Sequence, residues 1–160
     1  MSTSNFVTRF GGIYEHSSWV AERAEPHLRE ETAAGDIARV MADCVDNASV
    51  EKQLELIRAH PDLAGKAQLA GKLTADSTTE QASAGLDQCT SAEFEQIQSL
   101  NDRYREKFSF PFVMAVRNSS RRQILDTFEC RLQSEYDDEF EAALVEIHKI
   151  ARLRLEAMGQ

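Results

Sequence analysis

Apolar residues recur every three or four positions along most of this 160-residue chain, with charged and polar residues between them. In the stretch 90–108 the apolar positions are Phe94, Ile97, Leu100, Tyr104 and Phe108. Positions spaced in this way share one face of a helix, so the pattern predicts an amphipathic helix with one buried stripe. Thr90 and Glu93 match a capping box, in which each side chain bonds the other residue's backbone N–H at the start of a helix.

The same spacing predicts helices in five further segments, which are 17–25, 36–46, 50–59, 120–136 and 137–158. No segment alternates between apolar and polar residues with a period of two. The 7 Gly and 3 Pro residues are also too few for a turn-rich β-sheet protein. We therefore predict an all-α fold, a single-domain helical bundle of about seven or eight helices that spans residues 1–160.

The charge of the chain restricts its partners. There are 18 basic and 27 acidic residues, which give a formal net charge of −9. This charge repels phosphate groups, so we expect neither nucleic acid nor an anionic membrane as a partner. The longest apolar run, 110–116, has seven residues, whereas a helix needs about 20 to span a bilayer.

The cysteines and the N-terminal residues bear on the cellular compartment. Cys44, Cys89 and Cys130 are odd in number, lie far apart and form no C-x-x-C pair. They are therefore a poor disulfide framework and a poor zinc site. Residues 1–10 contain no apolar signal core. We expect reduced thiols in a soluble, cytoplasmic protein.

Two segments interrupt the helical pattern. Residues 60–76 contain one Pro and two Gly, and residues 108–119 are an apolar stretch around Pro111. In a helical bundle, irregular segments are the places where backbone groups remain available to a ligand. We expect the functional site at these two segments.

His60 is a candidate general acid or base. It precedes Pro61, and a residue before proline avoids the α conformation, so the preceding helix is predicted to end at about Ala59. At a helix C-terminus the helix dipole favours the imidazolium form, which suits proton transfer near neutral pH. The alternative is a histidine that caps the helix and has no part in chemistry.

Ser77 and Glu80 match a second capping box, in which Ser77 caps a helix and Glu80 bonds back to it. In a functional interpretation, Glu80 faces His60 and sets its tautomer and charge, while Gln81 offers an amide to a substrate. The two interpretations are compatible, because a helix N-terminus also attracts anions.

The other histidines, His16, His27 and His148, lack metal-ligand spacing, so we expect no metal. Near the C-terminus, Arg152 and Arg154 lie in the last turns of a predicted helix, where a cation is favourable. Either one is able to supply the positive charge that an anionic substrate needs. Both flank the predicted apolar stripe, so helical geometry leaves the choice between them open.

Several longer motifs resemble one known family, the 2-oxo-4-hydroxy-4-carboxy-5-ureidoimidazoline (OHCU) decarboxylases of urate catabolism. The motifs are HPDLAGKA at 60–67, STTEQASAGLD at 77–87, FPFVMAVR at 110–117, YEHS at 14–17 and IARLRL at 150–155. The resemblance covers essentially the whole chain. It departs from the family at Ser18, where Pro is usual, and at Met114 and Asn118.

The resemblance implies an all-α enzyme, usually a homodimer, that works without a metal or cofactor. Members of this family convert OHCU into (S)-allantoin and carbon dioxide. On this basis His60 matches the catalytic histidine and Glu80 its carboxylate partner. The substrate-binding positions that the resemblance implies are Pro61, Ser77, Gln81, Phe112, Val113, Met114, Ala115, Val116 and Arg154.

The implied chemistry suits these residue types. Loss of carbon dioxide leaves an electron pair that the substrate ring accepts, and one carbon must then be protonated. A histidine is able to move these protons, and a carboxylate behind it stabilises the imidazolium. Two alternatives remain open from the residues alone. One is a helical interaction module with an acidic surface, and the other is hydrolysis or isomerisation of a related ureide.

Overall fold

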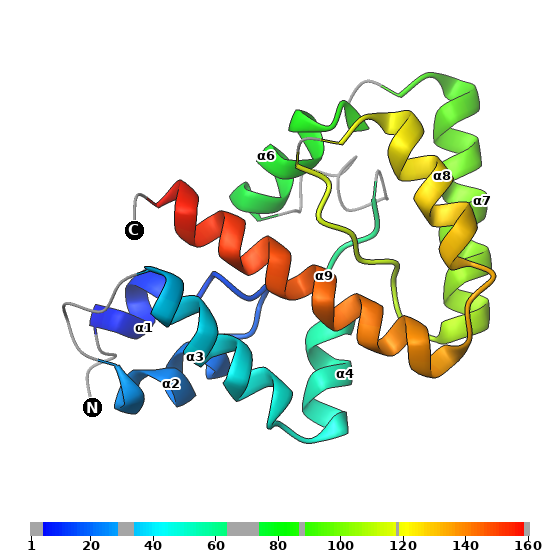
Figure 1. Cartoon of the computed structure of the whole chain (residues 1–160). Coiled ribbons are helices and arrows are strands. Elements are labelled where there is room, and N and C mark those ends of the chain that lie inside the picture. The colour runs from blue at the N-terminus through cyan, green and yellow to red at the C-terminus, as the bar shows by residue number, and fades with distance from the viewer. Residues whose placement is uncertain (1–4, 29–33, 64–73, 87–88, 118, 159–160) are drawn as a thin grey trace. The chain divides into compact units, whose positions relative to one another are not determined.

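The computed structural model describes residues 5–28, 34–63, 74–86, 89–117 and 119–158. Within these residues it contains eight α-helices and one 3-10 helix, and no strand (Figure 1). The all-α prediction is therefore confirmed. The chain divides into two compact units, of which unit 1 comprises 1–60 and 147–160 and unit 2 comprises 61–146. The expectation of one domain over 1–160 stays a prediction.

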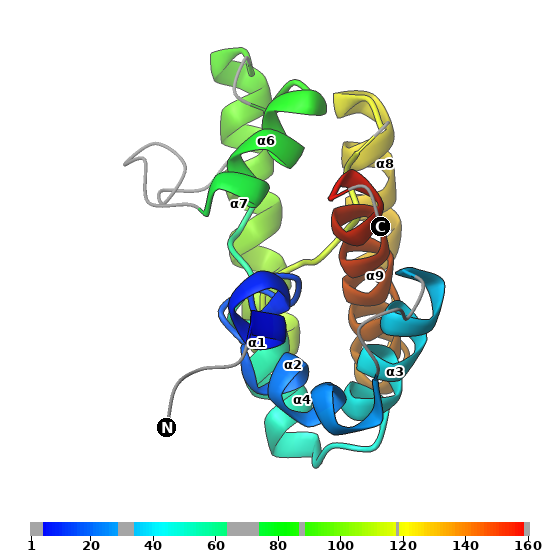
Figure 2. The same cartoon turned by 90° about the vertical axis from the view of Figure 1, so that its left-hand side faces the viewer.

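Unit 1 is built from the N-terminal helices and the C-terminal part of the last helix. The helices are α1 (Asn5–Phe10), α2 (Trp19–Ala24), a 3-10 helix (Glu25–His27), α3 (Ala34–Asp46), α4 (Val50–Arg58) and, from Ile147 onward, α9 (Tyr136–Ala157). Helix α2 packs against both α1 and α3 (Figure 2). The core of unit 1 contains Val20, Met41, Val45, Leu56 and Ile57, none of which is exposed.

The end of α4 places His60 outside the helix, as predicted. Ser49 caps the start of α4 by accepting a hydrogen bond from the N–H of Lys52, and Ala59 is its C-cap. The N–H of His60 still donates to the carbonyl oxygen of Ile57, at 3.2 Å, in the last turn. Pro61 follows, and it has no N–H with which to continue the helix.

Unit 2 contains α6 (Ala75–Ser83), α7 (Ser91–Phe108), α8 (Arg121–Arg131) and the part of α9 up to Glu146. Helix α7 begins with the predicted capping box of Thr90 and Glu93, and Ser120 and Gln123 form another at α8. Helices α7 and α8 pack side by side (Figure 1). An aromatic cluster fills the core, in which Tyr104 contacts Phe108, Phe110, Phe112 and Phe128 with ring centroids 4.5 to 5.9 Å apart.

The segment between α7 and α8 is irregular, as the sequence predicts. Helix α7 ends at Phe108, and its C-cap Ser109 has a left-handed backbone (φ 63°). Residues 109–117 and 119–120 form neither helix nor strand. Figure 2 shows this segment as a thin connection between the two helices. Phe110, Phe112, Val113 and Val116 are nevertheless buried. The segment is thus an ordered part of the core of unit 2.

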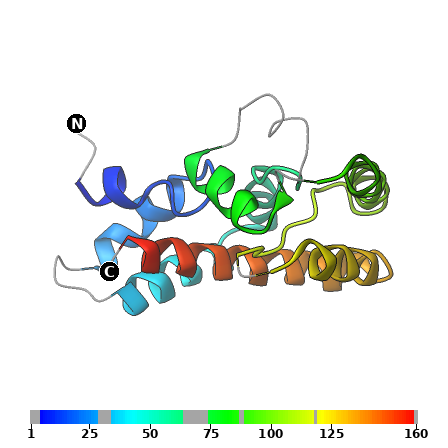
Figure 3. The same ribbon diagram turned by 90° about the horizontal axis from the view of Figure 1, so that it is seen from above.

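Three expectations differ from the structure or lie outside it. The helix expected over 120–136 ends at Arg131, because a turn follows in which the N–H of Ser134 bonds the carbonyl of Arg131. Helix α9 then begins anew at Tyr136 and continues through 22 residues (Figure 3). Of the segment 60–76, which was expected to be irregular, residues 64–73 lie outside the described residues, and residues 75–76 are the start of α6.

The predicted cap at Ser77 is wrong. Thr74 caps α6, since its hydroxyl accepts a hydrogen bond from the N–H of Ser77, so Ser77 lies inside the first turn. The side chain of Ser77 is buried, which places it on the inner face of α6. Two hydroxyl residues three positions apart both fit a cap, and the helix begins at the earlier one.

None of the described helices combines the length and the apolar character that would let it cross a membrane.

Candidate active site

His60 is buried, with 6% of its surface exposed, at the C-terminal end of α4. Its Nδ1 lies 2.9 Å from the backbone carbonyl oxygen of Leu56. A carbonyl oxygen only accepts hydrogen bonds, so Nδ1 must carry a proton and donate it. In the neutral ring Nε2 then holds the lone pair. This tautomer makes Nε2 the atom of His60 that is able to take a proton from a substrate.

The charge state of His60 differs from the sequence expectation. Burial lowers the pKa of the imidazole to about 4, because water no longer stabilises the imidazolium. The hydrogen bond to Leu56 and the charge of Glu15 raise this pKa, and the charge of Arg154 lowers it. The helix dipole was expected to favour the imidazolium, but desolvation has the larger effect. His60 is therefore a neutral base at pH 7.

Arg154 and Glu15 form a buried ion pair in unit 1. Nη2 of Arg154 lies 2.7 Å from Oε2 of Glu15, and the two residues are 5% and 2% exposed. Nη1 of Arg154 also donates to the carbonyl oxygens of Gly12 and Ile13, at 3.3 and 3.4 Å. A buried guanidinium is costly unless it is paired and hydrogen-bonded, and here it is both. Arg154 is thereby held in one orientation.

Glu15 was missed as a functional candidate by sequence reasoning. It appears there only within the motif YEHS, and 139 positions separate it from Arg154. A side-chain hydrogen bond closes the turn at Glu15, in which Ser17 Oγ donates to the carbonyl oxygen of Glu15 at 2.8 Å. The next residue, His16, has a left-handed backbone (φ 48°), which is unfavourable for a residue other than glycine. A strained turn of this kind is a signal that only a structure provides.

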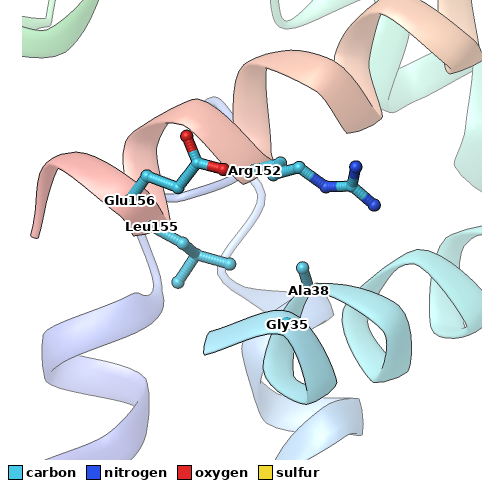
Figure 4. A pocket seen from close by; sticks show the side chains of 5 residues that line it. All are labelled: Gly35, Ala38, Arg152, Leu155 and Glu156. Atoms are coloured by element: carbon cyan, nitrogen blue, oxygen red, sulfur yellow. The ribbon is translucent and has the colours of Figure 1, made fainter. Parts of the chain in front are cut away.

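The structure distinguishes the two arginines. Arg152 is exposed and extends beside a cavity of about 210 Å³ (Figure 4). The cavity is lined by Gly35, Ala38, Arg152, Leu155 and Glu156. Arg154 instead points into unit 1, where its charge acts on His60. Of the two, Arg154 is the arginine in the buried surroundings of the candidate base.

A chain of hydrogen bonds supports the turn that carries Glu15. Nε2 of His148 lies 3.0 Å from a carboxylate oxygen of Asp46, and Nδ1 lies 2.8 Å from the hydroxyl of Tyr14. Because a carboxylate only accepts, Nε2 of His148 donates to Asp46. Burial raises the pKa of Tyr14, which therefore stays protonated. Helices α3 and α9 are thus both tied to the residue before Glu15.

Pro61, Ser77, Glu80 and Gln81 belong to unit 2. Ser77 and Gln81 are buried on α6, while Pro61 and Glu80 are half-buried. Nε2 of Gln81 donates to the carbonyl oxygen of Asp62 at 3.3 Å. Through this bond, α6 and the residues that follow His60 are held together within unit 2.

Asp62 has a second partner within unit 2. Its carboxylate accepts two hydrogen bonds from Arg105 of α7, at 2.9 and 3.0 Å. The short stretch after Pro61 is therefore anchored to α7 as well as to α6.

The predicted substrate-lining segment, Phe112 to Val116, is fixed by side chains from α8 and α9. The carbonyl oxygen of Val113 accepts a hydrogen bond of 2.6 Å from Nη1 of Arg131. The N–H of Ala115 donates to Oε1 of Glu146 at 3.2 Å. Phe112, Val113 and Val116 are buried, and Met114 and Ala115 are half-buried.

The structure thus gathers the predicted residues in two places. In unit 1, His60 and Arg154 share one buried region with Glu15. In unit 2, Gln81 is hydrogen-bonded to Asp62, the residue after Pro61. Phe112 to Val116 form a separate segment of unit 2. Across the described ranges, no three His, Cys, Asp or Glu side chains lie close enough to hold a metal ion.

Comparison with known proteins gives one family. The sequence model of a family described as OHCU decarboxylase matches residues 1–156. The 2-oxo-4-hydroxy-4-carboxy-5-ureidoimidazoline decarboxylase of Haloferax volcanii is 44% identical over 155 residues, which are 97% of this chain and 89% of that protein. The protein of the same name from Mus musculus is 37% identical over 155 residues, 97% of this chain and 86% of its own.

Solved structures agree with the fold. The crystal structure of (S)-allantoin synthase matches with a TM-score of 0.74 at 34% identity, over 94% of this chain and 48% of that one. This chain therefore spans about half of that protein. A crystal structure of OHCU decarboxylase in the presence of (S)-allantoin has a TM-score of 0.73 at 20% identity, over 91% of this chain and 94% of its own. The second likeness concerns the fold alone.

The low pKa of His60 predicts how stability depends on pH. Between pH 4 and about 6.5 the unfolded chain binds a proton at His60 and the folded chain does not, so the free energy of unfolding falls as the pH falls. His60→Asn keeps a donor for Leu56 but cannot be protonated. Between pH 7 and 4.5, urea unfolding should show the wild type losing about 1–3 kcal/mol more than this variant. If the free energies of unfolding of the two proteins fell equally over this pH range, the low pKa of His60 would be contradicted.

Proposed function

This chain belongs to the OHCU decarboxylase family, and we propose that it converts OHCU into (S)-allantoin and carbon dioxide in the degradation of urate. The observation that carries the proposal most directly is the neutral His60, whose Nδ1 donates to Leu56, in the same buried region as the Arg154–Glu15 pair. A base and a fixed cation are what the decarboxylation of an anionic substrate requires.

His60 acts first as a base and then as an acid. Nε2 takes the proton of the substrate hydroxyl while the bond between the ring carbon and the carboxylate breaks. Carbon dioxide leaves, and the electron pair of that bond passes into the carbon–nitrogen double bond of the substrate ring, whose nitrogen takes up one proton from water. The imidazolium then returns a proton to one face of a ring carbon, which gives a single enantiomer of allantoin. A pKa of about 4 makes the imidazolium a strong acid for this last step.

Arg154 binds the substrate carboxylate. The carbonyls of Gly12 and Ile13 and the carboxylate of Glu15 fix the plane of its guanidinium. A guanidinium that is already held in one plane loses little conformational entropy when it binds a carboxylate.

The residues of unit 2 enter the proposal through the motifs that they share with the family. Glu80 matches the family's carboxylate partner of the catalytic histidine. Pro61, Ser77, Gln81 and the segment 112–116 contact the rest of the substrate. The reaction needs no metal or cofactor, because the substrate ring accepts the electron pair. We also propose that the enzyme is a single-domain homodimer in the cytoplasm.

The direct test follows the decay of OHCU by circular dichroism after it has been generated from urate in the assay. We expect the wild type to accelerate the decay and to yield (S)-allantoin, whereas His60→Asn should lose activity by at least 10²-fold, the range of general acid–base catalysis. Glu80→Gln should also lower activity with little loss of stability. Decay at the spontaneous rate to racemic allantoin in the presence of pure wild-type protein would refute the proposed function.

The two arginines provide a matched pair of variants. Arg154→Lys keeps the charge but loses the planar donor pair, so KM should rise and kcat should fall markedly. Arg152→Lys is the control, and its kcat/KM should stay within about twofold of the wild type, a change of roughly 0.4 kcal/mol. Steady-state kinetics with OHCU measures both. The reverse pattern would assign the substrate carboxylate to Arg152.

A further inference from the structure

We propose that Arg131 is a positioning residue of this enzyme, which holds the backbone of 112–116 in the conformation that binds substrate. The inference rests on the proposed function, in which this segment contacts OHCU. Nη1 of Arg131 donates to the carbonyl oxygen of Val113 at 2.6 Å. The same guanidinium lies over the ring of Phe112, 4.6 Å from the ring centroid. One side chain of α8 thus holds two consecutive residues of the segment.

Arg131 is itself held by a buried carboxylate. Its Nε and Nη2 donate to Glu139, with distances between 2.7 and 3.1 Å, and the side chain of Glu139 is only 2% exposed. The hydroxyl of Tyr104 donates to the same carboxylate from α7. Burial raises the pKa of Tyr104, so this hydroxyl keeps its proton. Side chains from α7, α8 and α9 therefore meet at one buried charge pair.

The contact with Val113 has a reason in the backbone of the segment. Residues 109–117 form no helix or strand, so their backbone groups lack the regular partners that secondary structure provides. A buried carbonyl without a partner is costly, and Arg131 supplies that partner to Val113. Glu146 does the same for the N–H of Ala115. Side-chain hydrogen bonds therefore contribute to the conformation of the segment.

A purely stabilising role would not call for a charged pair. Replacing a buried ion pair with apolar residues of similar volume is often neutral or stabilising, so the pair is weak support for a role in stability alone. A guanidinium also has a fixed planar fork, which binds a carboxylate on one side and a carbonyl on the other with defined directions. Such directional contacts are suited to holding binding groups in place before the substrate arrives.

The test compares Arg131→Lys with a control in the same helix. Lys keeps the charge opposite Glu139 but loses the planar donor set that reaches both Glu139 and Val113. Ile124→Val is the control, because Ile124 is fully buried in α8 and loses one methylene without a polar contact. In Arg131→Lys we expect KM for OHCU to rise at least tenfold with a smaller change in kcat, and amide exchange at 112–116 to accelerate. The control should change neither.

Tyr104→Phe is a second variant, which removes one hydrogen bond to Glu139 and keeps the ring in the core. It should raise KM by a smaller factor, in the same direction. An unchanged KM in folded Arg131→Lys would overturn the inference while the proposed function stands. An equal rise of KM in Ile124→Val would also overturn it, because loss of stability would then explain both. A wild-type protein that fails to accelerate OHCU decay would refute the proposed function itself.

Discussion

A buried guanidinium must be paired with a carboxylate and must have its remaining donors bonded, and this constraint shapes both units. In unit 1 Arg154 is paired with Glu15 and donates to backbone carbonyls at Gly12 and Ile13. In unit 2 Arg131 is paired with Glu139 and donates to the carbonyl of Val113. In each case an arginine on a helix fixes the backbone of a non-helical segment. The helices thereby determine the conformation of both segments, of which we assign 112–116 to the substrate.

The same burial determines the state of His60. Its charged neighbours act on the pKa in opposite directions, since Glu15 raises it and Arg154 lowers it, and desolvation leaves the imidazole neutral. The carbonyl of Leu56 then selects the tautomer. Neutral His60 is able to take a proton from an anionic substrate without first losing one of its own, and Arg154 in the same buried region is paired with Glu15. The fold therefore prepares the base before the substrate binds.

The sequence predicts the helices well, because helical spacing depends on local residues. The stretch 90–108 carries both a stripe and a cap, and the structure has α7 over Ser91–Phe108. The cap of α6 was placed at Ser77 because Ser77 and Glu80 fit the motif, whereas Thr74 offers an equally good hydroxyl one turn earlier. The motifs that identify the family give His60 and Arg154, both of which are buried. The expectation that His60 favours the imidazolium form is wrong, because its pKa depends on burial in the tertiary structure. The sequence also does not reveal the roles of Glu15, Arg131 and Glu139, because each resembles an ordinary charged residue until its distant partner is known.

The central claim is that His60 is a neutral base whose proton lies on Nδ1. A ¹⁵N NMR titration of the histidine side chains in the free protein tests it most directly, with His60→Asn used to assign the signal. The account predicts a neutral ring at pH 7, protonation only as the pH approaches about 4, and nitrogen shifts of a protonated Nδ1 and an unprotonated Nε2. A His60 pKa at or above 6.5, or a proton on Nε2 in the neutral ring, would contradict it.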